Sequence, residues 1–264
     1  MTYQFVTVEK ADRIATVRFD RGNAANALSP ALMRELTDVA LELADDATLC
    51  AVVLTGRDDN FCLGMDLKDV EVIASAQAGL AHRRRMLKAG PRMCEAWEAL
   101  EALTIVAIEG WCVGGGVALA VACDLRVVGA RGHLYVPEIE RGFNMSWGSV
   151  PRITNLAGPA RAKRVIVLAE QLDATRAQQW GLIDEVAADG TALQTALTLA
   201  SRAAALPPNG VHLCKRAINA HANALNAASS HAEMDQFALL QQTDDCAEGV
   251  RAFVEKRPPV FTGL

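Results

Sequence analysis

Residues 110–125 read GWCVGGGVALAVACDL, and this segment constrains the fold more than any other part of the chain. Three consecutive glycines, Gly114 to Gly116, precede an apolar run that reaches Cys123 and then meets Asp124. A glycine run between a strand and a helix lets the backbone approach another group closely. The N–H groups of the first helical turn then lie at the positive end of the helix dipole. The segment therefore predicts a turn that either packs tightly or holds a negatively charged oxygen.

Length and composition exclude several classes of protein. The chain has 264 residues, of which 51% are hydrophobic, so it can bury a large core. A formal net charge of −5 argues against a general nucleic-acid-binding protein. The seven cysteines form no C-x-x-C pair, and no apolar stretch is long enough for a membrane span. The N-terminal segment carries charges where a signal peptide needs an apolar stretch. We therefore expect a cytoplasmic protein with no nucleic-acid or membrane partner.

Short apolar strands that alternate with helices predict an α/β fold. We expect strands at 3–8, 13–19, 51–54, 104–108 and 125–128. We expect helices at 30–45, from 66 onward, at 79–103 with an interruption or bend near 90–91, and at 217–228. After about residue 155 the pattern is mainly helical, with a break at 206–210. We therefore divide the chain into a core, 1–200, and a C-terminal helical region, 201–264.

Several common site motifs are absent from the sequence. A G-x-G-x-x-G dinucleotide motif would need glycine at position 119, where Leu119 stands. There is no P-loop, no H-E-x-x-H and no G-x-S-x-G, and the five histidines show no metal-ligand spacing. We therefore expect neither a metal nor a cofactor.

A second glycine-containing turn, residues 60–66 (NFCLGMD), has the same context of strand, turn and helix. Backbone N–H groups from two such turns can converge on one oxygen and stabilise the negative charge that develops on it. The alternative is that both turns only allow tight packing.

With these motifs in place, the chain resembles the crotonase superfamily, also called the enoyl-CoA hydratase/isomerase family. The resemblance covers nearly the whole chain. The segments that carry it are Phe61-x-x-Gly64-x-Asp66-Leu67, Ile108-x-Gly110-x-x-x-Gly114-Gly115-Gly116, Ala122-Cys123-Asp124, Pro137-Glu138-x-x-x-Gly142, Ala177-x-x-x-Gly181-Leu182-Ile183-x-x-Val186 and the tail from Asp244 to Arg257.

The resemblance implies a fold and a class of ligand. It implies a spiral of ββα units with a C-terminal helical region that serves trimer assembly, and a homo-oligomer that is a trimer or a dimer of trimers. The substrate would be an acyl-CoA thioester, whose oxygen accepts hydrogen bonds from the N–H groups of Met65 and Gly115. Asp66 and Gly114 would border the same site, with Asp66 in the first turn of a helix.

The resemblance also implies contacts with the rest of the substrate. Lys68 lies where a coenzyme A contact is often found in the family. Phe253 and Lys256 lie where a neighbouring subunit often touches the adenine end. Trp147 follows the expected base closely, and we expect it to shape the acyl pocket.

The sequence departs from the family pattern at one catalytic position. Hydratases of this family usually have two glutamates that hold one water between them. Glu138 matches the second glutamate, but Ala118 occupies the position of the first. A single carboxylate suffices to move a double bond from the 3 to the 2 position of an enoyl thioester. We therefore expect an enoyl-CoA isomerase that uses Glu138. The alternatives are an enoyl-CoA hydratase and a non-catalytic acyl-CoA-binding protein.

The remaining acidic residues near these motifs have expected structural roles. If residues 135–140 are extended, Glu138 and Glu140 share one face. For Glu140 we expect a surface pair with Arg141. Asp124 and Glu109 are expected to support the fold.

Overall fold

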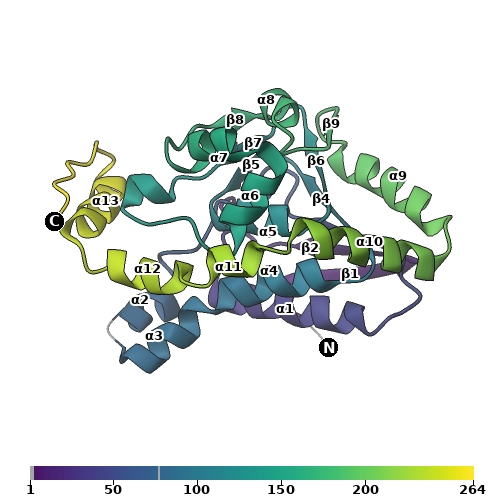
Figure 1. The fold of residues 1–264 in the computed structure, drawn as a ribbon, viewed down its shortest axis with the longest axis horizontal. Coiled ribbons are helices and arrows are strands. Elements are labelled where there is room, and N and C mark those ends of the chain that lie inside the picture. Colours follow the sequence, from purple (N-terminus) through teal and green to yellow (C-terminus); the bar gives the residue numbers. More distant parts are fainter. Residues whose placement is uncertain (1–2, 77) are drawn as a thin grey trace.

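The computed structural model describes residues 3–76 and 78–264, and within them the chain forms two sheets surrounded by helices (Figure 1). The larger sheet has six strands in the order β1-β2-β3-β4-β6-β9, and the smaller has three in the order β5-β7-β8. The strands are β1 (Val6–Ala11), β2 (Ile14–Phe19), β3 (Ala51–Thr55), β4 (Leu103–Ile108), β5 (Trp111–Val113), β6 (Leu125–Gly129), β7 (His133–Tyr135), β8 (Leu172–Asp173) and β9 (Glu185–Ala187).

The helices follow the strands in an order that confirms the expected α/β class. They are α1 (Pro30–Ala44), α2 (Val70–Ala76), α3 (Leu80–Leu87), α4 (Ala89–Ala99), α5 (Gly115–Ala122), α6 (Ser149–Ala157), α7 (Pro159–Ile166), α8 (Ala174–Gln179), α9 (Ala192–Ala204), α10 (Pro208–Ala222), α11 (Asn226–Ser230), α12 (Glu233–Leu240) and α13 (Asp244–Glu255). A short 3-10 helix, η1 (Glu138–Arg141), follows β7.

Strand pairing explains the spiral of the chain. The β1–β2 hairpin is antiparallel, whereas β2, β3, β4, β6 and β9 pair in parallel. After β4 and again after β6, the chain leaves the large sheet and adds a short strand, β5 or β7, to the small sheet. These two short strands are parallel, and an isolated bridge between Cys62 and Cys112 continues the pattern one turn earlier. Successive turns of the chain are therefore stacked in register.

The large sheet buries a different set of helices on each face. On one face, the alanines of α9 pack against the side chains of β3, β4 and β6. The spacing of Ala192, Ala196, Ala200 and Ala203 places them along one side of the helix. On the other face, α1, α4 and α5 share a larger core with the small sheet. In Figure 1, α9 lies at the right-hand end of the longest axis and α13 lies at the left-hand end.

Several predicted elements are confirmed. The strand segments at 51–54, 104–108 and 125–128 form β3, β4 and β6. Helix α1 begins as expected, with the Ser29 hydroxyl accepting a hydrogen bond from Leu32 N–H and Pro30 at the first helical position.

Other predicted elements are wrong in extent. The helix expected at 79–103 is interrupted at Lys88, close to the predicted break, but its second part ends at Ala99. Pro91 lies in the first turn of α4, where a missing N–H costs little, so the proline does not bend the helix. The helix expected at 217–228 ends at Ala222. Strands β5, β7, β8 and β9 were not predicted, because each has only two or three residues.

The C-terminal region is joined to the core through buried polar contacts. His212 Nε2 lies 2.7 Å from the Leu49 carbonyl oxygen, and Lys215 Nζ donates to the Ala102 carbonyl at 2.9 Å. The predicted boundary at residue 200 lies inside α9, and the chain turns at 205–207 instead. The assignment of residues 201–264 to oligomerisation stays a prediction. Among the described residues, no helix combines the length and the apolar character needed to cross a membrane.

Candidate active site

The stacking of the spiral brings three turns of the chain together. Val113 N–H donates to the Cys62 carbonyl at 2.8 Å, and Gly114 N–H donates to the Tyr135 carbonyl at 2.8 Å. The segment after Cys62, the segment after Cys112 and the segment after Leu134 therefore lie side by side. Three residues beyond Cys62 and Cys112 come Met65 and Gly115, and Glu138 follows at nearly the same step on the third segment.

Met65, Gly115 and Glu138 line one cavity of about 360 Å³. Its lining includes residues of α3, α12 and α13, which lie toward the left of Figure 1. The full lining comprises Ala25, Ala27, Met33, Leu63, Gly64, Met65, Asp66, Leu67, Lys68, Met86, Leu87, Gly90, Val113, Gly114, Gly115, Ala118, Pro137, Glu138, Arg141, Phe143, Asn144, Met145, Ser146, Trp147, Met234, Phe237 and Phe253. Most of these side chains are apolar, as in a site that excludes water.

Two backbone N–H groups in this cavity wall are unpaired. Within the described part of the chain, neither Met65 N–H nor Gly115 N–H donates a hydrogen bond to another protein group. The turn that carries Met65 is held on both sides, because Leu28 N–H donates to Gly64 O at 2.8 Å and Asp66 N–H donates to Leu28 O at 3.0 Å. Gly115 begins α5, so its N–H lies at the positive end of that helix. The arrangement suits an oxygen that becomes negatively charged.

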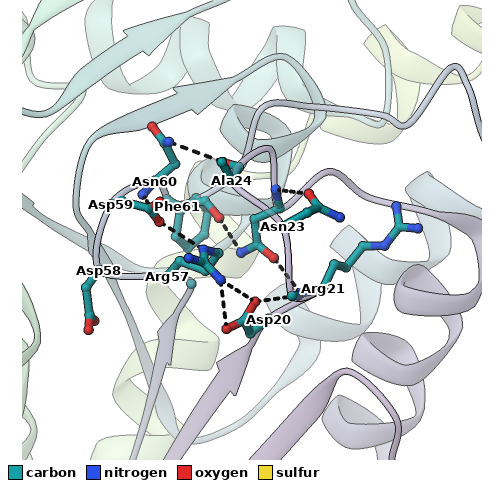
Figure 2. Close-up of polar contacts among 12 residues, drawn as sticks. Asp20, Arg21, Asn23, Ala24, Arg57, Asp58, Asp59, Asn60 and Phe61 are labelled. Atoms are coloured by element: carbon teal, nitrogen blue, oxygen red, sulfur yellow. Dashed lines mark hydrogen bonds and ion pairs between the residues drawn. The ribbon is translucent and has the colours of Figure 1, made fainter.

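The loops behind the Met65 turn are fixed by a polar network (Figure 2). Arg57 pairs with Asp20 at 3.0 Å, and Asn60 Nδ2 donates to Ala24 O at 3.2 Å. The fully buried Asn26 donates from Nδ2 to the carbonyl oxygens of Phe19 and Phe61, at 3.2 and 2.9 Å. Sequence analysis missed Asn26, because its partners lie on separate loops and no local spacing marks it.

The glycines are required by close contacts between the turns. Gly114 has φ +51° and ψ −112°, a conformation that residues with a Cβ rarely adopt. A Cβ at Gly114 would lie 2.5 Å from Glu138 Oε1. At Gly116, a Cβ would lie 2.9 Å from the Cβ of Cys62. The glycine run therefore lets the first turn of α5 approach both neighbouring segments.

Substituting Gly114 tests the importance of this approach. We expect Gly114→Ala to lower turnover by about 100-fold, because displacement of a catalytic group by about 1 Å costs on that order. A matched control is Gly190→Ala, since Gly190 also has positive φ but no atom lies within 4 Å of its added Cβ. Both variants should lose about 1–3 kcal/mol of stability in denaturant unfolding. Equal turnover in the two variants would contradict the contact with Glu138.

Glu138 is half-buried, and one oxygen of its carboxyl group is shielded from solvent without a partner in the described part of the chain. Its Oε2 is buried and, within the described residues, has no hydrogen-bond partner. Burial raises the pKa of Glu138 to about 7 from 4.5, against the opposing effects of a backbone hydrogen bond and of the Arg141 charge. A carboxyl with this pKa can both accept and return a proton near neutral pH.

The other carboxylate of the cavity wall, that of Asp66, forms an ion pair. Of the two acidic residues that line the cavity, Asp66 accepts a hydrogen bond from Arg21 Nη1 at 2.6 Å. We expected Asp66 in the first turn of a helix, but α2 begins only at Val70. That expectation is wrong. Asp66 instead forms an ion pair with Arg21, and this pair supports the turn that contains Asp66. Ala118 is fully buried and lines the cavity, so no second acid stands at that position.

Glu140 also differs from its prediction. Because η1 is a 3-10 helix and not an extended segment, Glu138 and Glu140 do not share a face. Glu140 is exposed and accepts a hydrogen bond from the Tyr135 hydroxyl, whereas Arg141 donates to the Pro137 carbonyl at 3.1 Å. The expected pair between Glu140 and Arg141 is therefore absent. Glu109 and Asp124 have structural contacts, to Ala192 N–H and to Lys215.

Of the residues expected to bind the rest of the substrate, some line the cavity and one does not. Lys68, Trp147 and Phe253 line the cavity, and Lys68 is exposed. The Phe253 ring, 4.1 Å from the Arg141 guanidinium carbon, lines the cavity of its own chain. Lys256 does not line the cavity and ends α13 in a left-handed conformation.

The sequence analysis missed the contribution of α12 and the neighbouring loop. Met234 and Phe237 of α12 line the cavity, and Phe237 packs on Phe143 at 5.0 Å between ring centroids. Asn144 Nδ2 donates to the backbone carbonyl of Glu233 at 3.2 Å. This leaves Asn144 Oδ1, which is buried and has no protein partner among the described residues.

Comparison with known proteins places this geometry in a family. Residues 9–263 match the family described as enoyl-CoA hydratase/isomerase. The chain is 30% identical to the 2,3-dehydroadipyl-CoA hydratase of Escherichia coli K12, over 97% of this chain and 98% of that protein. It is 29% identical to the crotonyl-CoA hydratase of Syntrophomonas wolfei, with 99% of each chain covered. The crystal structure of carnitinyl-CoA hydratase from Mycobacterium avium superposes with a TM-score of 0.86 at 31% identity, covering 100% of both chains.

The fold and the site define a crotonase-type protein, with unpaired backbone donors at two glycine turns of a ββα spiral. The chain belongs to the enoyl-CoA hydratase/isomerase family. This confirms the family, the crotonase-like fold and the type of enzyme that the sequence predicts.

Proposed function

We propose that the protein is an enoyl-CoA isomerase, which moves a double bond of an acyl-CoA thioester with Glu138 as the only proton shuttle. The observation that carries the proposal is the single unpaired carboxyl of the cavity wall, next to two unpaired backbone donors and with alanine at position 118. Asp66 is paired with Arg21 and cannot replace a second glutamate.

The proposed reaction begins with the ionised Glu138. Its carboxylate removes a proton from C2 of a 3-enoyl thioester, and the electrons move to the thioester oxygen. The N–H groups of Met65 and Gly115 stabilise the resulting dienolate by hydrogen bonds in a site with little water. The protonated Glu138 then returns the proton at C4, which yields the 2-enoyl thioester and restores the carboxylate. No second acid takes part.

Binding of the coenzyme A part belongs to the same proposal. The exposed ammonium of Lys68 would contact a phosphate, and Gly114 and Asp66 would border the thioester. Phe253 and Lys256 would contact the adenine end. Because Phe253 lines its own cavity and Lys256 does not, Lys256 would serve a neighbouring subunit in a trimer or a dimer of trimers.

Hydration of a 2-enoyl thioester is the second candidate function. Two observations favour it: relatives named as hydratases, and the unpaired Asn144 Oδ1 in the same cavity wall as Glu138 Oε2. A buried acceptor without a partner is costly unless a ligand supplies a donor. A water molecule could donate to both oxygens and be activated by Glu138.

One assay distinguishes these functions. The purified protein is given 3-hexenoyl-CoA and, separately, 2-hexenoyl-CoA in deuterated water, and product mass and thioester absorbance are followed. Isomerisation with exchange of label supports the first proposal, and addition of water to the 2-enoyl thioester supports the second. Binding of both ligands without either reaction would support the non-catalytic alternative and overturn the proposed function.

The pH dependence of isomerisation is a further test. We expect kcat/KM to rise with pH through a midpoint near 7 and then to level off, because only the ionised Glu138 removes the C2 proton and burial holds its pKa at about 7. Initial rates with 3-hexenoyl-CoA across a series of buffers would measure the profile. A midpoint near 4.5, the usual value for glutamate, would indicate a solvated carboxyl and contradict the proposed site.

A further inference from the structure

The loop after η1 places a tryptophan inside the cavity in a strained backbone conformation. Trp147 has φ +62° and the following Gly148 has φ +67°. A left-handed conformation is unfavourable for a large side chain, so other contacts must compensate for it. The indole also lines the cavity that contains Met65 and Glu138.

The indole lies between two glycines from different helices. A Cβ on Gly90 of α4 would lie 2.0 Å from indole Cε2, and a Cβ on Gly115 of α5 would lie 2.7 Å from indole Cζ3. Any side chain at either glycine would therefore collide with the ring. The indole fills the space between the start of α4 and the start of α5, directly beside the expected oxyanion donor.

Buried charges hold the backbone of this loop. Arg152 Nη1 donates to the Trp147 carbonyl at 2.9 Å, and the same guanidinium makes two bonds to Glu98, at 2.8 and 2.9 Å. Gly148 N–H donates to Glu233 Oε2 at 2.8 Å. Arg152 and Glu233 are both buried, at 6% exposure. These contacts from α4, α6 and α12 hold the loop backbone, and the close fit of the indole against Gly90 and Gly115 makes the ring a wall of the cavity.

Most of the other residues that line this cavity are apolar. Met33, Met86, Leu87 and Met145 line the same cavity, and Ala118 contributes only a methyl group. An acyl chain that leaves a thioester held at Gly115 therefore enters an apolar compartment that the indole limits.

We propose that the Trp147 indole closes the acyl compartment and restricts the protein to short acyl groups. This inference rests on the proposed function, because it takes the cavity to be the acyl-CoA site. Gly90 is required for this arrangement, because a residue with a side chain there would collide with the ring. The restriction therefore comes from two residues of this chain, Trp147 and Gly90, which are in direct contact.

Binding and turnover are measured separately, so that the inference and the proposed function can fail independently. Titration calorimetry with butyryl-, hexanoyl-, octanoyl- and decanoyl-CoA measures acyl binding without catalysis. Steady-state rates with the matching 3-enoyl thioesters measure turnover. For the unsubstituted protein we expect affinity and kcat/KM to fall by roughly 10–200-fold once the chain is too long for the compartment, as for other methylene mismatches.

The Trp147→Gly variant removes the indole from the acyl compartment, and glycine readily adopts the positive φ of this position. We expect it to recover most of the loss for octanoyl- and decanoyl-CoA, so that the ratio of decanoyl-CoA to butyryl-CoA affinity rises. Trp147→Phe, which keeps a ring and so a folded loop, should shift the limit by a smaller amount. The control is Trp111→Phe, because Trp111 stacks on His133 outside the cavity and should leave the profile unchanged.

The possible outcomes are distinct. A changed chain-length profile in binding, without turnover of any thioester, would support the inference and overturn the isomerase function. Tight binding of decanoyl-CoA by the unsubstituted protein would overturn the inference. The inference would also be overturned if the Trp147→Gly and Trp147→Phe variants kept the chain-length profile of the unsubstituted protein, even if the isomerase function holds.

Discussion

Replacing Glu138 with glutamine is expected to abolish isomerisation while coenzyme A thioesters still bind. Glutamine has nearly the same shape but cannot accept a proton from C2, and a positioned general base contributes about 10²–10⁴-fold to the rate. Since Glu138 Oε2 has no other partner within the described residues, no group is expected to take over this role. Turnover of 3-hexenoyl-CoA and the dissociation constant of hexanoyl-CoA would be measured on the same preparation.

The same variant has a second, independent signature in its stability. The folded state holds the Glu138 proton with a pKa of about 7, whereas the usual value is 4.5. The stability associated with the protonated carboxyl is therefore fully present below about pH 4.5 and is lost as pH rises through 7. At pH 8, Glu138→Gln should be more stable than the parent by up to about 3 kcal/mol.

A control substitution separates catalysis from general damage. Glu140→Gln changes the exposed neighbouring carboxyl, which contacts the Tyr135 hydroxyl and does not line the cavity. It should leave turnover and the pH dependence of stability nearly unchanged. Undiminished isomerisation by Glu138→Gln would remove Glu138 from the mechanism, whatever the stability measurements show.

The second large effect is expected at Asp124, which ends the apolar segment of α5. Its Oδ2 lies 2.7 Å from Lys215 Nζ and accepts hydrogen bonds from Thr104 N–H and Oγ1, at 2.7 and 2.8 Å. Both side chains are largely buried, at 6% exposure for Lys215 and 15% for Asp124. Asp124→Asn would leave a buried ammonium without its counter-charge, and we expect it to cost about 3–5 kcal/mol of stability.

Denaturant unfolding at one protein concentration would measure this loss. The double variant Asp124→Asn/Lys215→Met removes both charges and should recover part of it, because no buried charge is then left unpaired. A matched control is Asp46→Asn, since Asp46 pairs with Lys10 at the same distance of 2.7 Å but on the surface. A surface pair contributes little, so its loss should be much smaller. Equal losses for Asp124→Asn and Asp46→Asn would contradict the structural role of the buried pair.

Elements with strong local signals could be predicted from the sequence. Helix α1 has a serine cap, a proline at its first position and a regular apolar face, and its bounds were predicted to within one residue. Strands β3, β4 and β6 are five or six residues long and mostly apolar. By contrast, β5, β7 and β8 have two or three residues, and they exist only because the spiral brings them into register. No local pattern distinguishes such segments from loops.

The site was only partly predictable, for the same reason. The two glycine turns could be found from their local spacing, whereas the acid at position 138 was identified through the resemblance to the family. The role assigned to Asp66 was wrong, because its partner Arg21 lies 45 residues away in the sequence. The partner assigned to Glu140 was wrong, because residues 138–141 form a 3-10 helix in which Glu140 bonds to Tyr135. The wall formed by α12 lies about a hundred residues beyond Glu138 and could not be placed from sequence.

The sequence by itself determined which chemical groups this protein has for acid–base work. It supplies a glutamate at 138, an alanine at 118 and glycines that allow close backbone approach. Only the tertiary structure decided how these groups behave. Burial sets the pKa of Glu138, Arg21 neutralises Asp66, and Gly90 admits the ring of Trp147. The physical reason is that residue type fixes what a side chain can do, whereas solvation and charge depend on neighbours that are distant in the chain.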